Sequence, residues 1–354
     1  MKIRLAIVDD DESYVKRLVN NLQISYADKL EIYYFSAFSK LADFMETNAV
    51  HVVLVSETIK ADISQMSENI SFAYLVSNKD IEELDGKPAV CKFQKIDLFY
   101  KNVLSLFADT EGRMVLRGRD GSGRLILFTS GQGGAGTSAA AAAFALNRAK
   151  AGEKVIYLNL DRFHKSSLCF SGEGNMSFSD VVYAIKSRRA NLSIKIESAI
   201  KKDVCGVDFF DACRNANDML ELNAEDVEQL LAALKNLDSY QYIVLDIPLD
   251  FSPVCRALIE NASSEMVLVG DGSEVGNIKL ERVLEVLTLM EEKKKGSIFS
   301  RTRLLYNRFS SKTGKQMVNL PIDCIGGIHR IEGAGYRELV ERLAENGVFE
   351  QIGG

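Results

Sequence analysis

A glycine-rich stretch is the part of this 354-residue sequence best suited to bind a charged ligand. Its consecutive residues are Gly131, Gln132, Gly133, Gly134, Ala135, Gly136, Thr137 and Ser138. Glycines allow successive backbone N–H groups to turn toward an anion, and a helix that starts behind them adds partial positive charge. The apolar run at 125–128 predicts a strand before the stretch, and the alanines at 139–143 predict a helix after it. This order predicts a phosphate-binding loop, although a tight turn without a ligand has the same pattern.

Three β-rich runs farther along the chain end in polar residues. The runs at 154–158, 243–245 and 303–306 lead into Asn159 with Asp161, into Asp246, and into Asn307 with Arg308. The carboxylate of Asp246 can hold Mg²⁺ directly or through water, opposite the hydroxyl of Ser138, because this ion prefers oxygen ligands. We therefore expect Ser138 and Asp246 to be the metal ligands.

The glycine loop and these polar positions resemble the MinD and ParA class of ATPases over residues 122–354. In the loop motif of that class, KGGxGK[ST], the glycines and the hydroxyl residue match Gly133, Gly134, Gly136 and Ser138. Both lysines of the motif are replaced, one by Gln132 and the other by Thr137. The resemblance implies one parallel sheet and a homodimer that holds ATP between two loops.

The same resemblance assigns roles to the polar positions. It implies ATP and Mg²⁺ as ligands, with ATP bound by residues 131–138. Asp161 falls in the switch region, as the expected catalytic residue, and Asp246 falls at the metal-binding position. Asn307 matches the residue that reads adenine, and Arg308 follows it.

The two missing lysines predict weak catalysis. Phosphoryl transfer depends mainly on charge and positioning around the γ-phosphate. Each preorganised contact of this kind contributes ~3 kcal/mol, about 10²-fold in rate. Backbone N–H groups, Mg²⁺ and base contacts still support binding, so we expect ATP binding with very slow or absent hydrolysis. Lys165 or Arg162 is the expected substitute if a cation is supplied from elsewhere.

The first 106 residues are expected to form a separate α/β domain. Apolar, β-rich runs occupy 3–8, 30–35, 51–56, 72–77 and 89–94, and stretches with helical periodicity lie between them. This alternation predicts a doubly wound parallel sheet with its chemistry at the carboxyl ends of the strands.

This domain resembles the receiver domain of two-component response regulators. The acidic pair of that family matches Asp9 and Asp10, its hydroxyl residue matches Ser77 and its lysine matches Lys95. The phosphoacceptor position, however, falls on Ser56, and a serine without an activating base is a poor nucleophile. We expect an inactive receiver-like domain used for docking, while helix capping by the acidic residues is the simpler alternative.

The order of the domains indicates a narrower family. An atypical receiver-like domain at 1–106, a linker at 107–121 and a MinD/ParA-like domain at 122–354 together resemble the CpaE/TadZ proteins of Flp-type (Tad) pilus assembly. The resemblance implies a cytoplasmic, homodimeric ATP-binding scaffold that is recruited to the cell pole. Its N-terminal domain would bind pilus assembly proteins or a polar landmark. The alternative is a partitioning or positioning ATPase with slow turnover that binds DNA through the basic segments 186–202 and 293–295.

Composition narrows the remaining classes of protein. The net charge of −6 argues against specific nucleic-acid binding. No apolar run approaches the ~20 residues that a membrane helix requires, so we expect no direct membrane insertion. The six cysteines form no CxxC pair, which argues against a zinc site or a disulfide framework.

Overall fold

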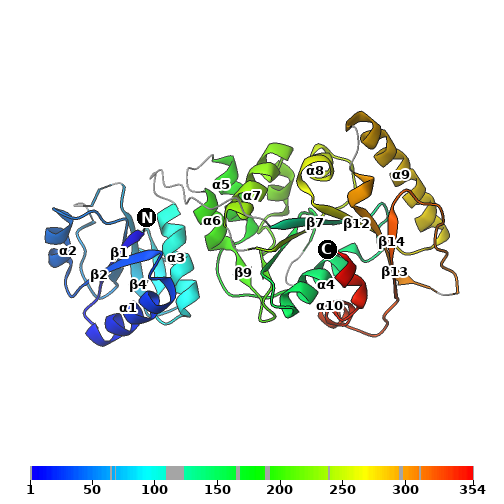
Figure 1. Ribbon diagram of the computed structural model, residues 1–354. Helices are drawn as coiled ribbons and strands as arrows, with labels where there is room; N and C mark the ends of the chain where they lie inside the picture. The colour runs from blue at the N-terminus through cyan, green and yellow to red at the C-terminus, as the bar shows by residue number, and fades with distance from the viewer. Residues whose placement is uncertain are drawn as a thin grey trace. The chain divides into compact units, whose positions relative to one another are not determined.

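The computed structural model describes residues 2–353 except 64–65, 68, 109–122, 165–167, 188–191, 238–239, 295–297 and 311. Its described residues form two compact α/β units (Figure 1). The N-terminal unit contains the described residues up to Ala108 and also helix α6 (Leu192–Ala199). The C-terminal unit contains the described residues from 123 to 186 and from 200 onward. The predicted linker lies outside the described residues, apart from Phe107 and Ala108, which end a helix.

The N-terminal unit is built on one sheet with the strand order β2-β1-β3-β4-β6-β5. Its strands are β1 (Ile3–Val8), β2 (Leu30–Phe35), β3 (Val52–Ser56), β4 (Ser71–Val76), β5 (Glu83–Leu84) and β6 (Lys87–Cys91). All neighbours pair in parallel except β5 and β6. The side chains that point to one face pack against α1 (Glu12–Tyr26) and α3 (Ile96–Ala108), and those of the other face pack against α2 (Phe38–Met45).

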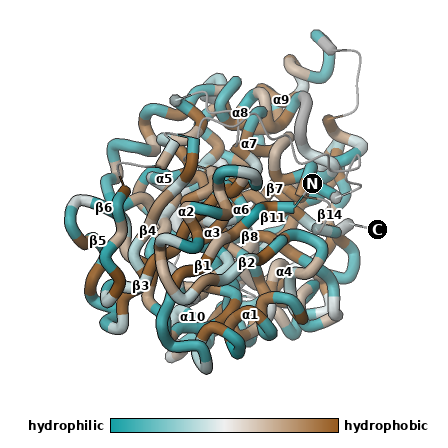
Figure 2. Tube along the Cα trace, turned by 90° about the vertical axis from the view of Figure 1, so that its left-hand side faces the viewer, coloured by the Kyte–Doolittle hydropathy of each residue, from teal (hydrophilic) through white to brown (hydrophobic). Residues whose placement is uncertain are grey.

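Helix α1 shows how the sequence specifies these elements. Asp11 caps its N-terminus by accepting a hydrogen bond from the backbone N–H of Tyr14 at 2.9 Å. Val15, Leu18 and Leu22 recur at helical spacing and are buried against the sheet. The trace in Figure 2 accordingly alternates between hydrophobic and hydrophilic residues along this helix.

Helix α6 belongs to the N-terminal unit although the chain on both sides of it belongs to the other unit. Its Ile194 is 1% exposed and joins the hydrophobic core formed by β1, α1 and α3. Lys29 Nζ lies 2.6 Å from Glu197 Oε1, and Lys195 Nζ donates to Ser105 Oγ at 3.0 Å. The N-terminal unit is therefore made from two separate segments of the chain.

The C-terminal unit is built on a second sheet with the order β14-β13-β12-β7-β11-β8-β10-β9. Its strands are β7 (Arg124–Thr129), β8 (Val155–Asn159), β9 (Lys201–Lys202), β10 (Asp208–Phe209), β11 (Tyr242–Asp246), β12 (Glu265–Gly270), β13 (Thr302–Phe309) and β14 (Asp323–His329). Among the described strands of this sheet, β9 and β10 are the one antiparallel pair, and they lie at one edge. Strand β7 lies in the interior, between β12 and β11. Both sheets are predominantly parallel, which confirms the predicted fold class.

Helices cover this sheet. They are α4 (Thr137–Lys150), α5 (Phe178–Lys186), α7 (Ala224–Asn236), α8 (Pro253–Ala257), α9 (Glu274–Lys294) and α10 (Tyr336–Ala344), with the short turns η3 (Ala216–Glu221), η4 (Leu258–Ala262), η5 (Phe299–Arg301) and η6 (Gly347–Gln351). Residues 139–146 of α4 are all buried, because the sheet covers one side of this helix and α10 packs on another (Figure 1). Among the described residues, no helix combines the length and the apolar character needed to cross a membrane.

Candidate functional site

A cavity of about 1020 Å³ opens beside the loop that joins β7 to α4. Parallel strands place their carboxyl ends at one edge of the sheet, and the strand order changes direction at β7, which is where α/β proteins bind ligands. The predicted residues that line the cavity are Gly131, Gln132, Gly133, Gly134, Gly136, Thr137, Ser138, Asp161, Asp246, Asn307 and Arg308. Ala135, the remaining predicted residue, is buried in the loop. The structure thus brings together segments that are up to 177 residues apart, from Gly131 to Arg308.

The loop itself has the geometry of an anion site. Gly134 and Gly136 both have a φ of 81°, a conformation that side chains disfavour. Gly136 is the N-cap of α4, and within the described chain no side chain caps this helix and no acidic residue lies in its first turn. The first backbone N–H groups of a helix have no partner inside the helix. Together with the helix dipole, they fit the phosphate groups of a ligand.

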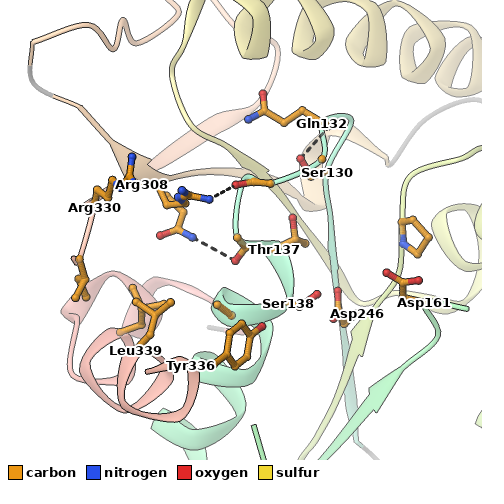
Figure 3. A pocket seen from close by; sticks show the side chains of 18 of the residues that line it. Ser130, Gln132, Thr137, Ser138, Asp161, Asp246, Arg308, Arg330, Tyr336 and Leu339 are labelled. Carbon is orange, nitrogen blue, oxygen red and sulfur yellow. Dashed lines mark hydrogen bonds between the residues drawn. The ribbon is translucent and has the colours of Figure 1, made fainter. Parts of the chain in front are cut away.

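The buried carboxylate of Asp246 lies at the end of β11, next to the start of α4. Its Oδ2 accepts hydrogen bonds from the Tyr157 hydroxyl at 2.9 Å and from Asn159 Nδ2 at 2.7 Å. The Ser138 hydroxyl bonds to the same carboxylate, and Ser138, Asp246 and Asp161 lie close together in Figure 3. Burial raises the pKa of Asp246 to about 6, although the hydrogen bonds from Ser138 and Tyr157 oppose this shift.

The donor set at Asp246 fits Mg²⁺ bound together with phosphate. The described residues contain no group of three His, Cys, Asp or Glu side chains placed to hold a metal. Mg²⁺ commonly takes one or two carboxylates and completes its shell with water and phosphate oxygens. Asp246 and Ser138 would supply the protein ligands in that arrangement.

Asp246 should make the ligand-free protein less stable at neutral pH. Its pKa rises on folding from 3.8 to about 6, so the folded state holds a proton that the unfolded state has lost between these values. Stability from this group is therefore complete below pH ~4 and is lost as the pH rises through ~6. Asp246→Asn removes the buried charge, and we expect it to raise the free energy of unfolding at pH 7.5 by roughly 2–3 kcal/mol. Denaturant unfolding of the metal-free chain at pH 7.5 and pH 4.5 measures this.

The control for this prediction is Asp250→Asn. The Asp250 side chain is 41% exposed, so its replacement should change stability by less than about 0.5 kcal/mol. If Asp246→Asn is instead less stable than the parent at pH 7.5, the hydrogen bonds to the carboxylate outweigh its burial.

Asn159 connects Asp246 to the backbone that follows β8. Its Nδ2 donates to Asp246, and its Oδ1 accepts from the backbone N–H of Asp161 at 2.8 Å. A carboxylate at position 159 could not donate and would place a second negative charge beside Asp246. Asp161 Oδ1 accepts from the backbone N–H of Phe163 at 3.0 Å, and Asp161 itself lines the cavity.

Neither position of the missing lysines carries a substitute charge. The Gln132 side chain turns toward α9 and bonds to Asp271, on the far side of the loop from Ser138 in Figure 3. Arg162 is half-exposed, lies 4.0 Å from Asp250 and does not line the cavity. The other expected substitute, Lys165, lies outside the described residues.

Two residues of β13 contact the loop directly. Asn307 is 2% exposed, and its Nδ2 donates to the carbonyl oxygens of Ala135 and Gly136 at 3.0 and 3.2 Å. Arg308 Nη1 donates to the Gly134 carbonyl oxygen at 2.6 Å (Figure 3). The predicted part of Asn307 in reading adenine stays a prediction, since in this structure its amide bonds the loop.

The N-terminal unit contains a second polar cluster, at the ends of β1, β3 and β6. Lys92 Nζ lies 2.6 Å from Asp9 Oδ2 and donates to Ser56 Oγ at 2.8 Å. Ser56 Oγ is 2.8 Å from Thr58 Oγ1, which in turn donates to Asp10 at 3.2 Å. Ser56 is fully buried, and the amine that contacts it, Lys92 Nζ, is already paired with Asp9. The cluster offers Ser56 no activating base.

The structure corrects one of the expected receiver residues. The lysine in the cluster is Lys92 rather than Lys95, because β6 ends at Cys91 and Lys95 lies just before α3. Ser77 is exposed, and its backbone N–H donates to Glu57 Oε1 at 2.8 Å. The missed lysine had a signal in the sequence, since Lys92 directly follows the apolar end of a strand, as Asp9 does.

Comparisons with known proteins agree with this architecture. Residues 1–108 match the family model described as "TadZ-like, receiver domain". No curated protein matches the chain. A ParA family ATPase from Chlorobium tepidum TLS has a similar structure, with 17% identity, a TM-score of 0.50, and coverage of 64% of this chain and 95% of that one.

Two further solved structures match less well. The septum site-determining protein MinD from Pyrococcus horikoshii OT3, complexed with Mg-ADP, has 18% identity and a TM-score of 0.47 over 63% of this chain and 94% of its own. The MinD cell division protein of Aquifex aeolicus has 19% identity and a TM-score of 0.47, and the match covers 62% of this chain and 86% of that one. At these identities the comparison with the Chlorobium protein establishes a shared fold for the C-terminal unit.

Proposed function

Because the chain joins a TadZ-like receiver domain to a domain of the MinD/ParA fold, as CpaE/TadZ proteins do, we propose that it is an ATP-binding scaffold of Tad pilus assembly. In this proposal the C-terminal unit binds ATP with Mg²⁺, and two copies of the chain dimerise through this unit. The N-terminal unit binds pilus assembly proteins or a polar landmark and so recruits the complex to the cell pole.

One observation carries the nucleotide part of the proposal. The uncapped N-terminus of α4 and the pair of Ser138 and Asp246 face the same cavity, so anion donors and metal ligands lie side by side. The cavity, at about 1020 Å³, is large enough for a nucleotide. Its remaining wall includes the apolar side chains of Ile331, Leu339 and Leu343, which suit a base.

The charge around the loop supports slow turnover. Thr137 and Gln132 are neutral, and Gln132 is bonded to Asp271 within its own chain. Developing charge on the γ-phosphate would therefore depend on backbone N–H groups and Mg²⁺. We infer that ATP holds a dimer together for long periods and that Asp161, the proposed catalytic residue, acts inefficiently.

The test is binding and turnover on one sample of the full chain. We expect micromolar ATP affinity by calorimetry with Mg²⁺, and phosphate release no faster than that of Asp246→Ala. Ser138→Ala and Asp246→Ala should each weaken binding at least tenfold in Mg²⁺ and much less in EDTA, because they remove metal ligands. Asp250→Ala, an exposed acid nearby, is the matched control. Absence of ATP binding by the parent protein would refute the nucleotide role.

The N-terminal unit is proposed as a docking module because the phosphoacceptor position is a serine and the residues of the cluster are engaged with one another. Asp9 is already paired with Lys92, and Ser56 is buried and hydrogen-bonded.

Light scattering of the full chain with and without MgATP tests whether the protein forms the proposed dimer. A docking role further predicts that variants of the N-terminal surface abolish polar recruitment while ATP affinity stays unchanged.

A further inference from the structure

Asn307 and Arg308, named here the loop clamp, bond three consecutive carbonyl groups of the glycine loop. The Arg308 side chain donates to the carbonyl oxygen of Gly134, and the Asn307 side chain donates to those of Ala135 and Gly136. In a trans peptide the N–H points opposite to the C=O. The N–H groups of residues 135–137 therefore point away from the clamp. Figure 3 shows Arg308 on one flank of the loop and Asp246 with Asp161 on the other, so these donors face the side of the proposed metal.

The backbone of β13 is distorted so that both side chains can reach the loop. Consecutive side chains of a regular strand point to opposite faces. Here the pairing of β13 with β14 changes register between Tyr306 and Phe309, and Arg308 has a φ of 58°. A non-glycine residue in this conformation is uncommon, and such strain concentrates at ligand sites where surrounding contacts maintain it.

The charge of Arg308 has no acidic partner in the part of the chain that the structure describes. Among the described residues no carboxylate forms an ion pair with Arg308, whereas Arg330, the other arginine of the cavity wall, lies 3.5 Å from Glu332. A guanidinium bonded to a carbonyl polarises that peptide and strengthens its N–H as a donor. The cation therefore acts on the loop although both lysine positions are neutral.

We propose that Arg308 is a positioning residue for a polyphosphate group. It orients the loop N–H groups before the ligand arrives and supplies, through the Gly134 peptide, part of the charge that lysines give in related loops. This inference rests on the proposed nucleotide role of the cavity and deepens it.

Three substitutions at one position separate the side chain from the backbone. Glycine adopts the positive φ readily, so Arg308→Gly keeps the backbone and loses the side chain, whereas Arg308→Ala loses both. Arg308→Lys keeps a cationic donor. If the backbone sets stability, Arg308→Gly should have a higher free energy of unfolding than Arg308→Ala. If the side chain sets affinity, Arg308→Gly and Arg308→Ala should both bind MgATP about tenfold more weakly than the parent, and Arg308→Lys should bind it with intermediate affinity.

The probes are MgATP, inorganic tripolyphosphate with Mg²⁺, and adenosine, each titrated into the full chain by calorimetry. The proposal requires Arg308→Gly to weaken the binding of MgATP and of tripolyphosphate by a similar factor and to leave the binding of adenosine unchanged. It is overturned if the affinities of the three variants for MgATP rank in the same order as their free energies of unfolding. It is also overturned if Arg308→Gly loses as much affinity for adenosine as for the polyphosphates, or if it binds MgATP as tightly as the parent does. If the parent protein binds none of the probes, the proposed nucleotide role itself fails.

Discussion

Lys92→Met should lower the free energy of unfolding of the N-terminal unit by about 3–5 kcal/mol, because it leaves a buried carboxylate without its partner. The Asp9 side chain is 0% exposed and that of Lys92 is 9% exposed. Asp9 Oδ2 has no well-aligned hydrogen bond, so the ammonium charge at 2.6 Å is what balances it. Denaturant unfolding of the full chain measures the loss, and hydrogen exchange assigns it to residues 2–108.

Two further variants make this prediction specific. Adding Asp9→Asn to Lys92→Met removes the unpaired charge and should recover most of the lost stability. Lys95→Met changes an exposed lysine three residues away and should cost less than about 0.5 kcal/mol. Equal losses for Lys92→Met and Lys95→Met would contradict the assignment of Lys92 to the cluster.

Gly136→Ala should both abolish nucleotide binding and destabilise the C-terminal unit. Alanine at a φ of 81° costs about 1–2 kcal/mol, and its Cβ would lie 2.5 Å from Asn307 Nδ2. Asn307 is buried, so relieving this overlap would move the loop or β13 at a further cost of about 1–3 kcal/mol. We expect a total loss of roughly 3 kcal/mol, measured by unfolding, and no detectable binding of MgATP.

The neighbouring glycines provide matched controls. A Cβ at Gly133 or Gly134 meets nothing within 4 Å, but only Gly134 has a positive φ. Gly133→Ala should therefore leave the free energy of unfolding nearly unchanged. Gly134→Ala should lower it only by the cost of placing alanine at a positive φ. If Gly136→Ala is no worse than Gly134→Ala, the contact with Asn307 yields easily and the loop clamp is weaker than we propose.

The sequence predicted the elements with strong periodicity and the residues that end strands. The apolar run at 30–35 coincides with β2, and the run at 51–56 contains all of β3. The loop, Asp161, Asp246 and Asn307 meet at the cavity because each lies at, near or just beyond the carboxyl end of a parallel strand, and such ends lie at one edge of the sheet.

Features that depend on tertiary contacts could not be read from the sequence. The spacing of α6 indicates a buried face, but the spacing does not identify its partner, which is α3, a helix of the same N-terminal unit that is far away in the sequence. No glycine marks the positive φ of Arg308, which accompanies its hydrogen bond to the loop. Tyr157 was missed at the site, although it lies two residues before Asn159 and so on the same face of β8.

The origin of α6 determines when the N-terminal unit can finish folding during synthesis. Domains usually fold in order as the chain emerges from the ribosome. Here the sheet of the first unit is complete by Cys91, but Ile194 of its core is made more than a hundred residues later. Strands β7 and β8 and the glycine loop have emerged by then. A nascent chain, or a fragment ending at Ala108, would expose the apolar surface of α3 that α6 covers, so the early part of the protein depends on the later part for its solubility.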